Sequence, residues 1–301
     1  MTELVHITVC VCTYKRPQFL RLLLEALRCQ TTNQQFTYSI VIVDNDSEGS
    51  GKQIVDEFQS KNTVMVLYCN ESVQNIALAR NKALDKSKGT FVAFIDDDET
   101  PIERWLLLLY ETMRSYKAVG ILGPVLPCFQ EQPPTWIVKG KLCERKRFPT
   151  GTYIESASDT RTGNILLSKE FLDSHGFRFD PKFGLTGGED CDLFRRMMEK
   201  GAEFVWCDEA CVHEVVPSSR LTRRYLLKRA LLRGVANSHG VHFFSKSAGR
   251  SMLAMACYTS ALPLLIVAGH HHFMRFLIKT CDHLGKVIAV MGIKVLVKRQ
   301  T

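Results

Sequence analysis

The sequence predicts an α/β domain built on a mainly parallel sheet with helices on both faces. Apolar runs rich in Val and Ile recur through the first hundred residues, and amphipathic helical patterns separate them. Polar or acidic residues directly follow several of these runs. Strands buried on both faces appear as continuous apolar runs, and the helices between them form the crossovers of a parallel sheet. In such open sheets the ligand lies at the carboxyl ends of the strands.

Four strands and three helices are expected in the first hundred residues. The strands cover residues 7–14, 38–46, 64–69 and 91–95, and the helices cover about 16–30, 51–60 and 75–87. Pro17 suits the first turn of a helix, because the N–H that it lacks would have no helical partner there. Residues 75–87 place apolar side chains at helical spacing, which predicts an amphipathic helix.

The second half of the chain is less regular. Residues 127–160 are Pro-rich and of mixed charge, and a long irregular stretch inside a compact fold more often serves function than structure. The sequence then predicts a strand and helix over 163–174, a helix over 187–201 and a last short strand pair over 204–215. We therefore expect an α/β catalytic or binding domain over residues 1–217 and a helical C-terminal region over 218–301.

The C-terminal region differs in charge from the body. Residues 215–301 contain 14 Lys and Arg and a single acid, Asp282, which gives +13, whereas the preceding residues carry 25 basic and 30 acidic side chains, which gives −5. Within this region residues 252–269 form an uncharged apolar stretch. A basic region that contains such a stretch favours an anionic membrane surface over nucleic acid, because nucleic acid would not account for the apolar part.

The apolar stretch is about as long as the minimum for crossing a ~30 Å hydrocarbon core. Pro263 and several polar residues weaken a true span. We therefore expect in-plane or re-entrant association, with the basic helix that follows lying at the interface. The alternative is that the apolar stretch contacts protein, either as a helical cap on the body or between identical chains in a homo-oligomer.

The eleven cysteines are an odd number and contain no Cys-x-x-Cys pair. We interpret them as reduced, mostly buried thiols. Because the N-terminal residues lead straight into a strand with no signal-peptide pattern, we expect the chain to act in the cytoplasm.

The acidic triplet Asp96, Asp97 and Asp98 directly follows the apolar run 91–95. Adjacent carboxylates repel one another unless a cation neutralises them, and oxygen ligands suit Mg²⁺ or Mn²⁺. The triplet alone is also compatible with a solvated acidic turn. No Gly-x-Gly-x-x-Gly or Walker sequence follows any predicted strand, so dinucleotide redox chemistry and P-loop phosphoryl transfer lack their usual phosphate cradle.

Five motifs occur in order along residues 5 to about 215: VCVCTYKRP (9–17), VDND (43–46), NIALARN (75–81), IDDD (95–98) and GGEDCDL (187–193). In this order and spacing they resemble the family-2 glycosyltransferases of the GT-A fold, and in particular the bacterial glucosyltransferases of succinoglycan and other exopolysaccharide biosynthesis. The acidic triplet would then be the DXD motif of that family. Any one of the motifs would be weak evidence, but the five together are specific.

The resemblance implies a nucleotide site at the strand ends. Residues at this site would be Thr13, Tyr14, Arg16, Asp44, Arg80, Asp96 and Asp97. The base would stack on Tyr14, Asp44 would bind uracil or ribose, and Arg80 would meet the diphosphate or the base. Asp98 and His213 would hold Mn²⁺ or Mg²⁺. A solvated helix face for Arg80 and a structural role for His213 are the alternatives.

The second acidic centre lies in GGEDCDL. Asp190 is the candidate base that takes the proton from the acceptor hydroxyl, and Gly188 and Glu189 would contact the sugars. Ordinary first-turn acids of a helix are the alternative. Trp136 is either a platform for the acceptor sugar or a buried loop anchor.

The resemblance implies an inverting, metal-dependent glycosyltransferase. It would move a hexose, with glucose favoured, from a UDP-sugar to a hydroxyl of a growing glycan carried on a polyprenyl diphosphate or present as an oligosaccharide. The place of action would be the cytoplasmic face of the bacterial inner membrane, with the chain peripheral or monotopic. The rivals are a nucleotide-sugar- or glycan-binding protein without turnover and a sugar nucleotidyltransferase. The latter normally needs a Gly-rich basic loop near its N-terminus, which this sequence lacks.

Overall fold

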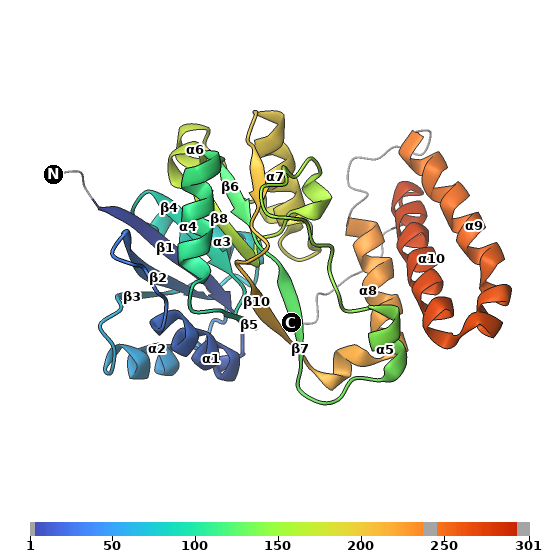
Figure 1. Cartoon of the computed structure of the whole chain (residues 1–301), viewed down its shortest axis with the longest axis horizontal. Helices are drawn as coiled ribbons and strands as arrows, with labels where there is room; N and C mark the ends of the chain where they lie inside the picture. The colour runs from blue at the N-terminus through green and yellow to red at the C-terminus, as the bar shows by residue number, and fades with distance from the viewer. Residues whose placement is uncertain (1–3, 237–245, 294–301) are drawn as a thin grey trace.

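A central seven-stranded sheet organises the body of the computed structural model, which describes residues 4–236 and 246–293 (Figure 1). Its strand order is β3-β2-β1-β4-β8-β6-β9. The strands are β1 (Val5–Thr13), β2 (Phe36–Asp44), β3 (Val66–Asn70), β4 (Phe91–Ile95), β6 (Gly120–Leu122), β8 (Asn164–Ser168) and β9 (Phe204–Trp206). The first four are parallel, β8 is antiparallel to both β4 and β6, and β9 is parallel to β6. The predicted mixed, mainly parallel sheet is confirmed.

Helices cover both faces of this sheet. On one face lie α1 (Pro17–Arg28), α2 (Lys52–Gln59) and α4 (Trp105–Tyr116), and on the other lie α3 (Ile76–Lys86), α6 (Lys169–Ser174) and α7 (Glu189–Glu199). Successive residues of a strand point to opposite faces of the sheet, so each strand contributes side chains to the apolar cores on both faces. Val9 and Val11 pack with the first set of helices, whereas Cys10 packs with the second. The strands and helices expected in the first hundred residues agree with the structure to within two residues at every end. Helix α4 was not among the expected elements.

A second, three-stranded sheet has the order β5-β10-β7. It consists of β5 (Glu99–Pro101), β7 (Val125–Phe129) and β10 (Val212–Val216). The expected pairing of two strands within 204–215 is wrong, because β9 joins β6 in the central sheet whereas β10 pairs with β5 and β7. Since β5 begins directly after the acidic triplet, this small sheet brings residues near 214 to the carboxyl end of β4.

Short helices occupy the connections: α5 (Thr135–Gly140), η1 (Ala157–Asp159), η2 (Pro181–Phe183) and η3 (Ser218–Leu221). Three longer helices then complete the chain: α8 (Arg223–Ala236), α9 (Lys246–Ala268) and α10 (His270–Val290). Helix α10 packs against α8, α9 and α5, and Figure 1 shows this helical group at the opposite end of the molecule from β3. A small apolar cluster containing Ile137, Val216, Leu221 and Leu226 joins α5, β10, η3 and α8.

Helices α8 and α10 approach closely at two glycines. A Cβ added at Gly285 would lie 2.0 Å from the carbonyl oxygen of Leu231 and 3.0 Å from the backbone nitrogen of Val235. A Cβ added at Gly234 would lie 2.0 Å from the carbonyl oxygen of Asp282. The clashing atoms belong to backbone, so no change of side-chain rotamer can relieve the contact and the helices would have to separate.

Gly285→Ala should therefore destabilise the protein by about 1–3 kcal/mol, the usual cost of overpacking a tight contact. Gly249→Ala is the matched control, because Gly249 lies in α9 and an added Cβ would meet nothing within 4 Å. Alanine at that site should be neutral or stabilising by up to about 1 kcal/mol through helix propensity. Urea unfolding followed by circular dichroism measures both changes, and equal midpoints for the two variants would contradict the close crossing.

Candidate functional site

The carboxyl ends of β1, β2 and β4 meet at one edge of the sheet and carry the first acidic centre. The register pairs Thr13 with Asp44 across β1 and β2, and the triplet follows β4 on the other side of β1. The Thr13 hydroxyl donates a hydrogen bond to Asp97 Oδ2 at 2.8 Å, so β1 and the triplet are joined directly.

The three carboxylates of the triplet have different surroundings. Asp96 is the open one, with 48% of its side chain exposed. Asp97 is buried and also accepts a hydrogen bond from Arg16 Nη1 at 3.2 Å. Asp98 is buried between two guanidinium groups, Arg16 at 3.2 Å and Arg220 at 3.4 Å. Arg16 therefore holds two members of the triplet in place.

Negative charge at this centre is only partly compensated. Burial raises the pKa of Asp97 to about 7, against the opposing charge of Arg16, and Asp98 adds to the rise. Burial and the neighbouring charges of Asp96 and Glu214 raise the pKa of Asp98 and hold that of Glu99 well above its usual range. A bound cation would favour the ionised forms of all three.

Arg80 joins the two acidic centres. Its Nη1 donates to Glu189 Oε1 at 2.5 Å, and its Nη2 reaches Asp96 Oδ1 at 3.4 Å. Although burial lowers it, the charges of Glu189 and Asp96 raise the pKa of Arg80 above its usual value. Because the side chain is buried, the alternative of a solvated helix face is wrong for this residue.

Asp44 lies fully buried at the end of β2. Its carboxylate accepts hydrogen bonds from the backbone N–H groups of Gly51, at 2.6 Å, and Asp46, at 3.1 Å, and from the Tyr68 hydroxyl at 3.1 Å. These bonds orient the turn that follows β2. Tyr14 is half-buried beside this turn region at the end of β1, with Lys15 Nζ 5.6 Å from its ring centre. Nucleoside contacts of Tyr14 and Asp44 stay predictions.

The second acidic centre begins helix α7. Gly187 and Gly188 have φ angles of 84° and 95°, so both adopt the left-handed conformation that favours glycine. This turn presents the first helical residues toward β4. Glu189 is buried against Arg80, whereas Asp190 is partly exposed and its Oδ1 accepts the N–H of Cys191 at 2.8 Å. The glycine pair and the helix start explain why two adjacent acids point to different surroundings.

Several residues of the site were not predicted from the sequence. Glu99 Oε2 accepts the Asp96 N–H at 3.1 Å, and its place directly after the triplet could have suggested it. Glu214 pairs with Arg220 at 3.2 Å and with Arg145, and the β10–β5 register sets it opposite Glu99. Arg145 and Arg220 lie far from the triplet in sequence, so only the tertiary structure identifies them.

Two predicted site residues lie apart from these contacts. His213 precedes Glu214 on β10 and is exposed; because successive strand side chains alternate, it points to the opposite face from Glu214. Its role as a metal ligand stays a prediction. Trp136 lies in α5 with its ring centre 5.3 Å from that of His270 at the start of α10, and it packs on the small apolar cluster of α5 and α8. That packing favours the loop anchor over the sugar platform.

The residues present fit a divalent cation whose coordination the substrate would complete. Within residues 4–236 and 246–293, no three His, Cys, Asp or Glu side chains form a ready-made metal cage. Mg²⁺ needs none, since it is commonly held by one or two carboxylates together with substrate phosphates. A half-exposed Asp96 beside the buried Asp98 supplies such a partial oxygen site.

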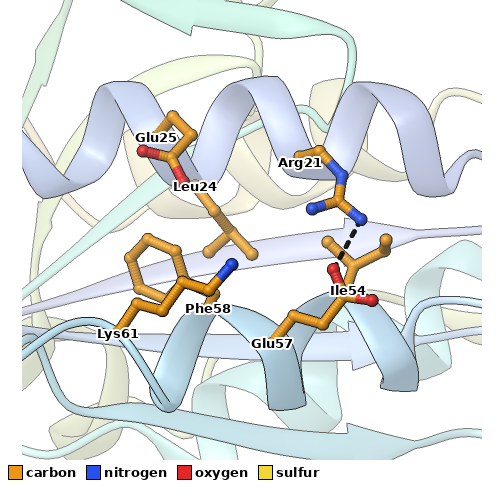
Figure 2. A pocket seen from close by; sticks show the side chains of 7 residues that line it. All are labelled: Arg21, Leu24, Glu25, Ile54, Glu57, Phe58 and Lys61. Carbon is orange, nitrogen blue, oxygen red and sulfur yellow. Dashed lines mark hydrogen bonds and ion pairs between the residues drawn. The ribbon is translucent and has the colours of Figure 1, made fainter.

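A shallow pocket also lies between α1 and α2 (Figure 2). It is lined by Arg21, Leu24, Glu25, Ile54, Glu57, Phe58 and Lys61. The Arg21–Glu57 ion pair at 2.7 Å joins the two helices there, and none of the lining residues belongs to either acidic centre. It therefore plays no part in the site.

Comparisons with known proteins agree with this geometry. Residues 8–178 match the family model of glycosyl transferase family 2. The chain is 32% identical to the succinoglycan biosynthesis protein ExoM of Rhizobium meliloti, over 97% of this chain and 95% of that protein. It is 29% identical to the glucosyl-dolichyl phosphate glucuronosyltransferase of Haloferax volcanii, over 57% of this chain and 55% of that protein.

Among solved structures, S. aureus TarS 1-349 in complex with UDP-GlcNAc superposes with a TM-score of 0.56 at 16% identity, covering 95% of this chain and 92% of that one. The same protein in complex with UDP gives a TM-score of 0.55 at 15% identity. At this identity the likeness shows the fold, which is GT-A. With the family model matching more than half of its length and a relative above 30% identity along nearly all of it, the chain belongs to glycosyl transferase family 2 and is a glycosyltransferase.

Proposed function

We propose that this enzyme transfers a hexose from a UDP-sugar to a hydroxyl of a growing glycan with inversion at the anomeric carbon. The observation that carries the proposal is the pair of acidic centres joined by Arg80, one at the end of β4 and the other at the start of α7. Such a pair separates two tasks, holding the donor diphosphate and activating the acceptor. A binding protein without turnover would not require a partly exposed carboxylate at Asp190.

Each residue then has a distinct task. Asp190 takes the proton of the acceptor hydroxyl as that oxygen attacks the anomeric carbon from the side opposite the leaving diphosphate. Glu189, fixed by Arg80, orients sugar hydroxyls, and Arg16 keeps Asp97 and Asp98 aligned. Mn²⁺ or Mg²⁺ held by Asp96 and Asp98 would stabilise the negative charge that develops on the departing nucleoside diphosphate.

The substrates are proposed from the relatives. TarS has been crystallised with UDP and with UDP-GlcNAc, which supports UDP as the nucleotide. ExoM is a succinoglycan biosynthesis protein, and the relative from Haloferax volcanii is a glucosyl-dolichyl phosphate glucuronosyltransferase. Both names support a role in the assembly of a surface polysaccharide on a polyprenyl carrier. Glucose remains our proposed donor sugar.

Calorimetric titration of UDP, GDP and CDP, with and without Mn²⁺, tests the donor side. We expect UDP to bind at least ~10-fold more tightly than GDP or CDP. Mn²⁺ should strengthen that binding, because burial and neighbouring carboxylates raise the pKa values of Asp97 and Asp98 and a bound cation would favour their ionised forms. A panel of UDP-hexoses, followed by donor hydrolysis, would identify the sugar. Absence of nucleotide binding in both series would refute the nucleotide-sugar donor proposed for this site.

We further propose that helix α9 binds an anionic membrane on its cytoplasmic side. Ala248–Ala268 is long and apolar enough to cross a membrane, and only 6% of its most apolar window is buried. Leu264, Ile266 and Val267 are 77%, 65% and 90% exposed, which costs free energy in water and none in lipid. Helix α10 packs against α8 and α9, and its predicted position at the interface stays a prediction.

Vesicle co-sedimentation of the full chain tests this surface. Replacing Leu264, Ile266 and Val267 together by Gln should weaken partitioning into anionic vesicles at least ~10-fold, because each buried aliphatic side chain contributes about 1.5–3 kcal/mol. The remaining binding should fall as salt rises, since the basic residues act through screened charge.

The matched control replaces three exposed apolar residues of the body, Leu22, Met65 and Val73, by Gln. This control should pellet like the wild type. Equal loss in both triple variants, or preference of the wild type for DNA over anionic vesicles, would contradict the membrane assignment. UDP binding measured in parallel confirms that the catalytic body is intact in each variant.

A further inference from the structure

The loop between η1 and β8 carries an arginine that the proposed mechanism does not use. Arg161 follows η1 and precedes β8, between Thr160 and Thr162, which are both buried. The residues on both sides of Arg161 pack closely against other parts of the body. A Cβ at Gly163 would lie 2.6 Å from Glu99 Oε1, and η1 packs against α7, the helix that begins with the second acidic centre. The loop that carries Arg161 therefore runs from α7, at the second centre, to Glu99 and Asp96 at the first.

Arg161 differs from the other arginines around the site. Arg16, Arg80, Arg145 and Arg220 each pair with a carboxylate. For Arg161, by contrast, the described residues provide no hydrogen bond and no ion pair within 4 Å. Asp190, Glu99 and Glu214 act on it only through longer-range electrostatics. The side chain is only partly exposed, so water does not fully solvate its charge.

The electrostatics agree with this geometry. Burial and the like charge of Arg145 lower the pKa of Arg161 to about 10, in spite of the surrounding carboxylates. The group is still protonated at neutral pH, so it carries a positive charge that the folded protein only partly offsets. A guanidinium in this state favours an anion that can accept two parallel hydrogen bonds, such as a carboxylate or a phosphate.

We propose that Arg161, supported by the like charge of Arg145, forms a subsite for an anionic group of the acceptor, either a carboxylate or a phosphate carried near the sugar that receives the hexose. The inference rests on the proposed function, because it takes Asp190 as the base that faces the acceptor. The donor diphosphate has Arg16, Arg80 and Arg220 at the first acidic centre. The charge of Arg161 acts on Asp190 as well as on Glu99 and Glu214, so the guanidinium lies within electrostatic reach of the proposed base, and we assign it to the second substrate.

Binding of small probes to the full-length protein tests the subsite. At saturating UDP and Mn²⁺, the probes are methyl glucuronide, glucose 1-phosphate and uncharged methyl glucoside, measured by calorimetry or ligand-observed NMR. The wild type should bind at least one anionic probe ~10-fold or more tightly than methyl glucoside. Tighter glucuronide binding would identify a sugar carboxylate as the group recognised, and tighter glucose 1-phosphate binding would identify a phosphate.

Arg161→Gln should remove this preference while leaving UDP affinity within about twofold. Arg161→Lys should retain part of it, because lysine keeps the charge but not the paired hydrogen bonds. Arg21→Gln, at the pocket between α1 and α2, is the matched control and should behave like the wild type.

Two results would overturn the proposal. One is wild-type binding of both anionic probes no tighter than that of methyl glucoside. The other is an Arg161→Gln variant that loses UDP affinity, since the guanidinium would then serve the donor diphosphate. Failure of the proposed function is separately visible as wild-type protein that binds no UDP. If Arg161→Gln does not fold, wild-type affinity for the anionic probes should fall between about 50 and about 500 mM salt, and affinity unchanged by salt would overturn the proposal.

Discussion

Asp190→Asn is expected to lower glycosyl transfer by ~10²-fold or more while leaving UDP affinity unchanged, the usual scale of general base catalysis. Asparagine keeps the size of the side chain and its contact with the Cys191 N–H, so α7 should keep its start. It cannot take a proton from the acceptor hydroxyl. Steady-state transfer assays and UDP titration, performed on the same preparation, separate turnover from donor binding.

Asp192→Asn provides the control within the same helical turn. Asp192 forms ion pairs with Arg195 and Arg196 on α7, both at 2.8 Å, and has no contact with Arg80. Its replacement should change turnover less than about twofold. If Asp190→Asn and Asp192→Asn both transfer sugar near the wild-type rate, Asp190 is not the base.

Asp98→Ala should weaken UDP binding in the presence of Mn²⁺ by ~10-fold or more and abolish the effect of Mn²⁺ on that binding. Removing this carboxylate takes away a proposed metal ligand and leaves Arg16 and Arg220 with one partner fewer. Loss of a charge-assisted contact costs about 1.5–3 kcal/mol, which corresponds to this range. Calorimetry with and without Mn²⁺ measures both parts of the effect.

Asp85→Ala is the matched control for this experiment. Asp85 is an exposed acid of α3 that pairs with Arg178 at 3.0 Å, and its loss should leave both UDP affinity and metal dependence unchanged. Metal-dependent UDP binding that persists in Asp98→Ala would show that Asp98 does not hold the cation. A larger loss in Asp96→Ala would then assign the metal to the exposed member of the triplet.

Much of the central fold could be predicted from sequence because its signals are local. Apolar runs such as 91–95 encode buried strands, and helical spacing over 75–87 encodes α3. The acidic triplet then had to lie at the carboxyl edge of the sheet, since parallel strands end at the same edge. GGED likewise predicted a helix start, because two glycines permit the turn and acids suit the first helical residues.

Contacts between distant segments could not be predicted in this way. Strands β9 and β10 are adjacent in sequence, yet they join different sheets, because β10 pairs with β5 after the triplet. That pairing brings Glu214, and with it Arg145 and Arg220, to the acids that follow β4. Nothing local in their sequences distinguishes these residues from ordinary surface charges.

The sequence by itself determined the strands and helices of the first ninety-five residues, the two acidic motifs and the family, because these depend on spacing within short segments. The tertiary structure alone decided which charges compensate one another, that Arg80 bridges the centres and that Arg161 lacks a carboxylate partner among the described residues. It also decided that α9, rather than α10, exposes the apolar surface. Electrostatic pairing and burial depend on which distant segments come together in space, and a single sequence records that only indirectly.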